Sequence, residues 1–289
     1  MKIGDIEREL DQARNDGPLS NIVIQPCPEL LMALQRETRK LDPDPAEIAR
    51  IASSDVAMAA ALLRIANSPL YARARPANTV GEAVTMLGMG QAVAILTGFI
   101  TRRAIPATSP LLAHFWETST RRSLAMAFIA RQLYGMNPEV AQTCGLFMHV
   151  GIPVMLQGLR GYAETLTEAM AQEDRSFTDI ENTRHRTDHA VIGAIVAKTW
   201  HLPPVVAIGV RLHHDFTILS DQAMPAELRC LVAVAALAEH MVADYEGVQS
   251  QPEWERYGAD CLSCLQIGQA EVDHWVDELH PVFEGVLLG

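Results

Sequence analysis

Signals that start α-helices recur along the whole chain, and they constrain the fold more than any other feature of the sequence. Asp44-Pro45-Ala46-Glu47 combines a capping side chain, a proline at the first helical position and an acidic residue in the first turn. Thr79 and Glu82 have the spacing of a capping box, and so do Thr178 and Glu181. Alternating β-branched runs closed by Asn-Gly or Asp-Gly turns are absent from the sequence. The sequence therefore predicts an all-α protein.

Apolar residues between these signals recur at helical spacing and predict a two-lobed multi-helix bundle. A seam rich in Pro, Ser and Thr at residues 104–110 separates an N-terminal helical lobe, residues 1–108, from a second lobe, residues 109–245. Residues 246–289 are expected to form acidic C-terminal helices packed on the second lobe. Within the first lobe the sequence predicts a helix over Val80 to Leu87 and a buried apolar helix over Gln91 to Thr101. The helices expected later in the chain lie near residues 111–134, 138–149, 161–173, 179–200, 204–214, 225–243, 253–264 and 269–286.

The net charge of −12 is concentrated at one end of the chain. Residues 221–289 contain two basic residues, Arg229 and Arg256, against thirteen acidic ones, and so carry −11 of it. A protein that binds duplex nucleic acid through its phosphates needs a basic face. The charge therefore argues against duplex nucleic acid and against an anionic membrane. The acidic segment serves solubility or contacts a partner.

Targeting signals are not evident, and the cysteine pattern is that of a reducing compartment. No apolar run approaches the roughly 18 residues of a membrane span, and the acidic N-terminus lacks the apolar core of a secretory signal. Five scattered cysteines predict reduced thiols. We therefore expect a cytoplasmic protein without a membrane partner.

The histidines form a pattern that can carry metal chemistry. His149 ends an apolar stretch, His185 and His189 are four residues apart on one expected helix, and His213 and His214 are adjacent at the end of another. Helical bundles build metal sites from imidazoles and carboxylates on facing helices. Such a site polarises a phosphoryl oxygen and supplies a metal-bound hydroxide. The alternative is that each histidine is only a hydrogen-bonded side chain.

Several segments occur in a specific order over about two thirds of the chain. They are Pro28-Glu29-Leu30-Leu31, the run from Ala49 to Val56, the run from Leu62 to Tyr71 with Asn67-Ser68, the run from Thr79 to Gly88, Phe115 to Ser119, Gly145 to Gly151, His189 with Gly193, Trp200 to Pro203, and His213-His214. This ordered set resembles the HDOD domain, the output-domain relative of the HD phosphohydrolases found in bacterial signalling proteins. The resemblance begins near residue 24 and implies that the second lobe is HD-like.

The resemblance also implies where a metal site of the HD type would lie. It puts Thr118 at the first histidine position, His149 at the histidine of the His-Asp pair, and Val150 in place of the aspartate. His189, His213, His214 and Glu239 fall at later ligand positions. Valine offers neither a lone pair nor a charge, whereas a two-metal phosphodiesterase centre needs bridging oxygen ligands. Neutral imidazoles alone can still bind zinc or nickel weakly.

These observations predict a non-catalytic bacterial signal-transduction or regulatory module of the HDOD type. It is expected to act through a signalling protein partner or a small nucleotide-like ligand, without a cofactor and without an attached effector domain. Asn67, Ser68 and Tyr71 are candidate ligand- or partner-binding residues, although turn and cap chemistry also explains the first two. The alternative is a divergent metal-dependent phosphohydrolase or phosphodiesterase that holds a divalent metal. Its ligands would be His149, His189, His213, His214 and Glu239.

Overall fold

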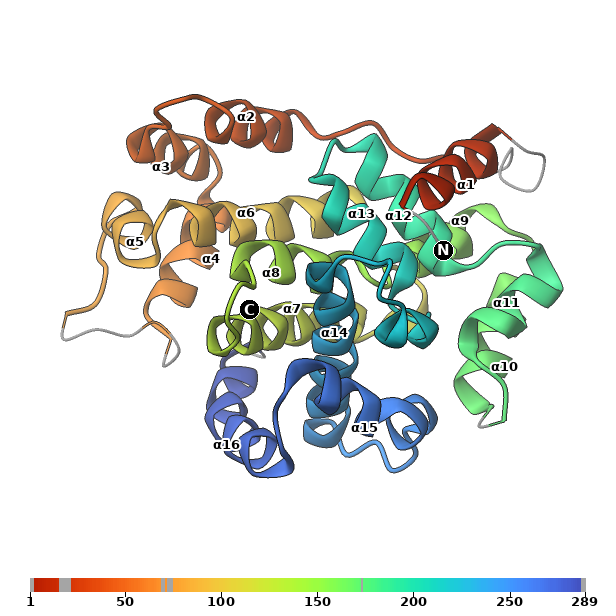
Figure 1. Cartoon of the computed structure of the whole chain (residues 1–289). Coiled ribbons are helices and arrows are strands. Elements are labelled where there is room, and N and C mark those ends of the chain that lie inside the picture. Colours follow the sequence, from red (N-terminus) through yellow and green to blue (C-terminus); the bar gives the residue numbers. More distant parts are fainter. Residues whose placement is uncertain (1–2, 16–21, 69–70, 72–74, 173, 287–289) are drawn as a thin grey trace. The chain divides into compact units, whose positions relative to one another are not determined.

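Every regular element that the structure describes is a helix, which confirms the all-α class (Figure 1). The structure is a computed structural model, and it describes residues 3–15, 22–68, 71, 75–172 and 174–286. The chain divides into two compact units. The small unit comprises residues 26–106 and 277–289, and the large unit comprises residues 1–25 and 107–276.

The small unit contains five helices of the N-terminal half. They are α2 (Glu29–Thr38), α3 (Pro45–Ser53), α4 (Val56–Ala66), α5 (Val80–Leu87) and α6 (Met89–Ala104). Asp44 caps α3 as expected, because its side chain accepts a hydrogen bond from the Ala46 N–H. The capping box of Thr79 and Glu82 at the start of α5 is also present. Gly88, with φ of 80°, ends α5 and lets the chain turn by 116° into α6.

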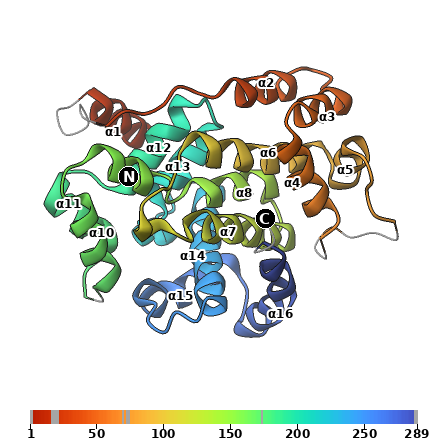
Figure 2. The ribbon, with the colours of Figure 1, turned by 180° about the vertical axis from the view of Figure 1, so that it is seen from behind.

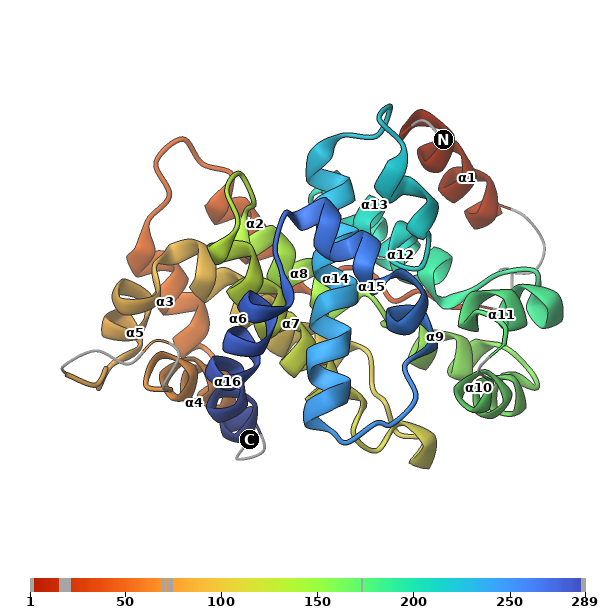
Figure 3. The same ribbon diagram turned by 60° about the horizontal axis from the view of Figure 1, so that its bottom comes forward.

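The large unit contains the remaining helices. The boundary between the units, at residues 276 and 277, falls inside α16 (Gln269–Val286). Its other elements are α1 (Ile3–Asn15), η2 (Pro110–Leu112), α7 (Phe115–Gln132), α8 (Pro138–Phe147), α9 (Gly151–Gly158), α10 (Tyr162–Ala171), α11 (Phe177–His185), α12 (His189–Thr199), α13 (Pro204–Leu212), η3 (Phe216–Ser220), α14 (Ala226–Tyr245) and α15 (Pro252–Leu265). Helix α14 packs on α7 and α15, and α12 packs on α13 (Figure 3). Apolar side chains of α12 and α14 are almost completely buried and form the core of this unit.

The N-terminal helix lies in the large unit, although the sequence grouped residues 1–108 in one lobe. Helix α1 packs on α12 and α13 (Figure 2). Ile6 and Leu10 of α1 are buried. Glu9 forms an ion pair with Arg211 of α13. The grouping by sequence position missed these contacts because they join residues about 200 positions apart.

The single helix expected over residues 179–200 is wrong, since two helices occupy this range. Arg186 adopts a left-handed conformation with φ of 58° and ends α11. Asp188 then caps α12 by accepting a hydrogen bond from the Val191 N–H. His185 and His189 consequently belong to different helices.

Among the described residues, one helical stretch, residues 138–158, is long and apolar enough to cross a membrane, and the bent pair α5 and α6 passes the same test if counted as one span. Within its most apolar window, 72% of the residues are buried inside the protein. A core helix of a soluble protein passes the same test of length and hydropathy. The stretch therefore supplies core packing for the large unit.

Candidate metal and ligand site

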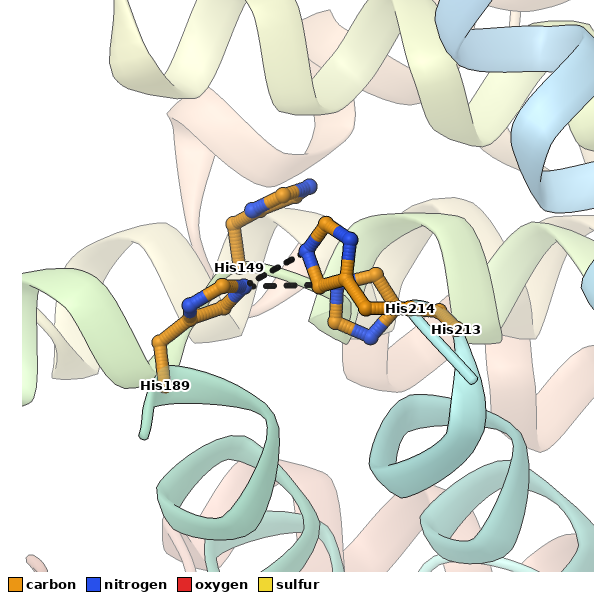
Figure 4. A group of neighbouring side chains, drawn as sticks. All are labelled: His149, His189, His213 and His214. Carbon is orange, nitrogen blue, oxygen red and sulfur yellow. Dashed lines mark hydrogen bonds between the residues drawn. The ribbon is translucent and has the colours of Figure 1, made fainter. Parts of the chain in front are cut away.

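Four histidines of the large unit converge on one point (Figure 4). His149 lies between α8 and α9, His189 is the first residue of α12, and His213 and His214 follow α13. One ring nitrogen from each lies within 4.8 Å of those of the other three. The sequence had predicted all four as metal-site positions, and the fold brings all four together.

Two distances between ring nitrogens of the cluster match those of a mononuclear metal site. The Nε2 atom of His189 is 3.3 Å from Nε2 of His213 and 3.2 Å from Nε2 of His214. A tetrahedral zinc ion at about 2.0–2.1 Å from its nitrogen ligands separates those nitrogens by roughly 3.3–3.4 Å. The ring of His149 stacks on that of His189 with 4.9 Å between centroids (Figure 4). The donor set therefore fits a single ion such as zinc.

In His189, His213 and His214, an acceptor at Nδ1 orients the imidazole. His189 Nδ1 lies 2.7 Å from Glu181 Oε2, and His214 Nδ1 lies 2.9 Å from Glu253 Oε2. His213 Nδ1 lies 2.6 Å from the Val210 carbonyl oxygen. An acceptor at Nδ1 assigns the N–H to that atom and points the lone pair of Nε2 at the shared centre. Carboxylates and carbonyls behind the ligands are the outer shell typical of metal-binding histidines.

The pKa of His214 is raised, whereas the pKa values of His149 and His213 are lowered. Burial alone would lower the pKa of His214, but the Glu253 carboxylate, together with Glu239 and Glu181, outweighs it and raises that pKa to about 9. Burial holds the pKa of His213 well below its ordinary value, and burial with the nearby Arg122 charge does the same for His149. At neutral pH His214 therefore carries a proton on Nε2, which lies 3.2 Å from His189 Nε2. A bound metal would replace this proton.

A buried arginine lies directly behind the cluster. Arg122 of α7 has a side chain only 10% exposed, and its Nε lies 3.3 Å from Glu239 Oε1. The same Glu239 oxygen lies 2.5 Å from His149 Nε2. Glu239 is therefore shared between an imidazole and a guanidinium, and it is not one of the four converging ligands. Thr118, the position of the first histidine by resemblance, instead donates a hydrogen bond to Glu246.

A glycine lets two helices approach at the cluster. A Cβ atom on Gly151 would lie 2.1 Å from the His189 carbonyl oxygen and 2.9 Å from its Cα. Gly193, one turn further along α12, would place a Cβ 3.2 Å from the Phe147 carbonyl oxygen. These contacts bring the start of α12 against the segment that carries His149. Both glycines belong to the segments that carried the resemblance.

Sequence reasoning missed three residues of the site, namely Glu181, Glu253 and Arg122. The spacing of Thr178 and Glu181 predicted a capping box, but Ser176 caps α11 through the Asp179 N–H. Glu181 is instead fully buried against His189. Nothing in the local sequence marks this role, because it arises from the packing of α11 on α12. His185 contacts Thr165 and lies outside the cluster.

The candidate binding residues of the small unit form a turn after α4. Both polar atoms of the Asn67 side chain bond the backbone of Ala77, with Nδ2 to O at 2.9 Å and N to Oδ1 at 2.7 Å. The Ser68 hydroxyl donates to the Ile65 carbonyl, and the Tyr71 N–H donates to the Ser68 carbonyl. These hydrogen bonds give Asn67 and Ser68 a structural role in the turn. Ligand or partner binding at Asn67, Ser68 and Tyr71 stays a prediction.

The helical fold and the histidine cluster together define an all-α, HD-like protein. The chain belongs to the HDOD domain family, since the sequence model of that domain matches residues 24–216.

Solved structures with the same fold cover nearly the whole chain. An HDOD domain protein with unknown function from Geobacter sulfurreducens is 20% identical with a TM-score of 0.69, over 97% of this chain and 99% of its own. A protein from Shewanella amazonensis SB2B, provisionally named a phosphohydrolase, is 20% identical with a TM-score of 0.71, over 97% and 96% of the two chains. A provisionally named signal transduction protein from Marinobacter aquaeolei VT8 is 16% identical with a TM-score of 0.73, over 99% of this chain and 65% of its own. At these identities the likeness shows the fold.

A curated relative extends well beyond the matching region. An uncharacterized protein of Treponema pallidum (strain Nichols) is 24% identical over 246 residues, which is 84% of this chain. The chain spans 46% of the length of that relative.

Proposed function

We propose that this chain is a non-catalytic regulatory module of the HDOD type, which acts by binding a small ligand or a signalling protein. The proposal includes a bacterial, cytoplasmic setting, as expected of HDOD proteins. The observation that carries it is the composition of the converging donor set. Among the described residues, that set consists of four imidazoles and contains no carboxylate oxygen.

The nearby carboxylates are engaged elsewhere, which supports the loss of hydrolytic function. Glu181 and Glu253 accept hydrogen bonds at the outer nitrogens of His189 and His214. Glu239 is held between His149 and Arg122. Val150, which is fully buried, stands where the resembled HD pair has its aspartate. A two-metal hydrolase needs bridging oxygens that stabilise both the attacking and the leaving oxygen.

A second candidate function is a divergent metal-dependent phosphohydrolase with one metal ion. The observation in its favour is the distance of 3.2–3.3 Å from the Nε2 atom of His189 to those of His213 and His214. A single zinc ion can lower the pKa of a bound water to about 7. The two functions differ in turnover, so a kinetic assay separates them.

The test uses the full chain purified without chelators. Bound metal is measured by mass spectrometry, and hydrolysis of bis(p-nitrophenyl) phosphate is followed with added Zn²⁺, Mn²⁺ or Ni²⁺. We expect the wild type and the His189→Ala variant to show the same background rate with each metal. Metal-dependent turnover that His189→Ala abolishes would overturn the non-catalytic function and favour the phosphohydrolase.

A further inference from the structure

A cavity of about 450 Å³ lies beside the histidine cluster in the large unit. It shares two residues with the cluster, since both His214 and Glu253 line its wall. This volume lies in the range of about 300–1,000 Å³ that is typical of small-ligand sites. Unlike most such sites, its lining is mainly charged and polar, which restricts the chemistry of an occupant.

Three arginines from different elements line this cavity. Arg175 precedes α11, Arg211 lies on α13 and Arg256 lies on α15. Arg211 is paired with Glu9, and Arg175 donates one hydrogen bond to Thr183 and one to the Asp179 carbonyl. A guanidinium has five N–H donors, so each arginine keeps further donors for an oxyanion. Arginines bind phosphate and carboxylate groups through paired N–H bonds.

The starts of three helices meet at the same cavity. Its lining includes first-turn residues of α11, α12 and α15, such as Asp179, Ala190 and Glu253. A helix N-terminus carries partial positive charge and free backbone N–H groups. The first-turn acids Asp179 and Glu253 and the capping Asp188 offset these helix ends, so the three guanidiniums are the groups of the cavity that favour an anionic ligand group.

The carboxylates of the cavity wall can accept hydrogen bonds from hydroxyl groups of a ligand. Asp188 already accepts hydrogen bonds from Asn182 and the Val191 N–H, and Asp215 accepts from Thr217. Each carboxylate has two oxygens and about four lone-pair sites, so both can accept further hydrogen bonds. Asp174 and Asp179 add two more carboxylates. A wall of this kind binds a molecule that donates several hydrogen bonds.

The aromatic residues of the wall pack on each other. The rings of Phe216 and Tyr257 stack on each other, with 4.4 Å between centroids and 16° between planes. The Arg256 guanidinium lies over the Tyr257 ring, 5.9 Å from its centroid. The two aromatic rings are therefore already in contact with neighbours, and they serve as a packed wall of the cavity.

We propose that this cavity binds a phosphorylated polyol such as a sugar phosphate, with its phosphate on the arginines and its hydroxyls on the carboxylates. The inference deepens the proposed regulatory function, on which it rests, by naming the class of ligand that the module senses. Glu253 couples the two sites, because it lines the cavity and also holds His214. Ligand contact at Glu253 therefore reaches the histidine cluster through one hydrogen bond.

The experiment is calorimetric titration of the full chain with ribose 5-phosphate, with ribose and inorganic phosphate as comparison probes. We expect Arg175→Gln and Arg256→Gln each to weaken binding of ribose 5-phosphate at least tenfold. Both side chains are exposed at the surface, so these variants should fold, which circular dichroism checks. The matched control is Arg160→Gln, an exposed arginine of the same unit outside the cavity, which should bind as the wild type does.

Three results would overturn this assignment. They are no binding of ribose 5-phosphate, unchanged affinity in both cavity variants, and binding of inorganic phosphate as tight as that of ribose 5-phosphate. The phosphodiesterase assay distinguishes this failure from failure of the proposed function. Absent binding together with absent turnover removes the ligand assignment alone, whereas metal-dependent turnover removes the non-catalytic function whatever the titration gives.

Discussion

Glu181 and His189 form a carboxylate–imidazole pair in which both side chains are fully shielded from solvent, with 2.7 Å between Oε2 and Nδ1. Glu181 also accepts hydrogen bonds from the His189 backbone N–H and from the Tyr162 hydroxyl. The carboxylate thus has three donors, which compensates its burial. This pair orients the imidazole on which the contacts of the histidine cluster depend.

We predict that Glu181→Ala will strongly destabilise the protein. The variant leaves the donors of His189 and the Tyr162 hydroxyl without their acceptor, and a buried unsatisfied donor costs about 1–3 kcal/mol. The matched control is Glu168→Ala, which breaks the more exposed pair with Arg184 and should cost at most about 1 kcal/mol. Urea unfolding of both variants measures the two changes. Equal costs would show that Glu181 has no special role.

The proton on His214 predicts a pH dependence of stability and of metal binding. The folded pKa of about 9 lies above the ordinary value of 6.5, so its contribution to stability is full below pH 6.5. That contribution is lost as the pH rises through about 9. Metal must displace the same proton, so Zn²⁺ affinity should rise with pH up to that value.

The variant that tests this prediction is Glu253→Gln, which removes the carboxylate that contributes most to raising the pKa of His214. We expect the imidazole resonance of His214 to titrate near pH 9 in the wild type and at a lower pH in the variant, as nuclear magnetic resonance can measure. Zn²⁺ binding to the variant should depend less steeply on pH between 7 and 9. A wild-type titration at the ordinary value for histidine would contradict the assignment.

Gly151→Ala should separate the two segments that carry His149 and His189. The added Cβ would lie 2.1 Å from the His189 carbonyl oxygen, which is backbone and cannot rotate away. Overpacking of this kind costs about 1–3 kcal/mol. Gly81→Ala in α5 is the control, since a Cβ there meets nothing within 4 Å. We expect thermal unfolding to shift down for the first variant only, together with weaker Zn²⁺ binding.

Asn67→Ala tests whether this residue serves structure or binding. Both polar atoms of its side chain bond the Ala77 backbone, which would lose two partners. The expected cost is about 1–3 kcal/mol in the free energy of unfolding. Titration with ribose 5-phosphate should be unchanged. An unchanged stability with altered binding of a ligand or partner would instead favour the contact role.

Sequence patterns predicted most helices because local chemistry sets their ends. Asp44 and Thr79 cap helices where expected, and Pro204 and Pro252 stand in their first turns. The break after His185 was not predicted, because it depends on the left-handed backbone conformation of Arg186. This conformation is uncommon for a residue other than glycine, so the sequence gives no signal for it.

The histidine cluster divides in the same way between sequence and tertiary structure. The order of segments along the chain was enough to nominate His149, His189, His213 and His214, since family resemblance is a property of sequence. Only the packing of α11, α14 and α15 places the carboxylates at ring nitrogens of these imidazoles. Those carboxylates belong to Glu181, Glu239 and Glu253. Glu181, for example, is eight residues from His189 in the chain and Glu253 is 39 from His214. Electrostatic partners are chosen by distance in space, and that distance is known only once the helices have packed.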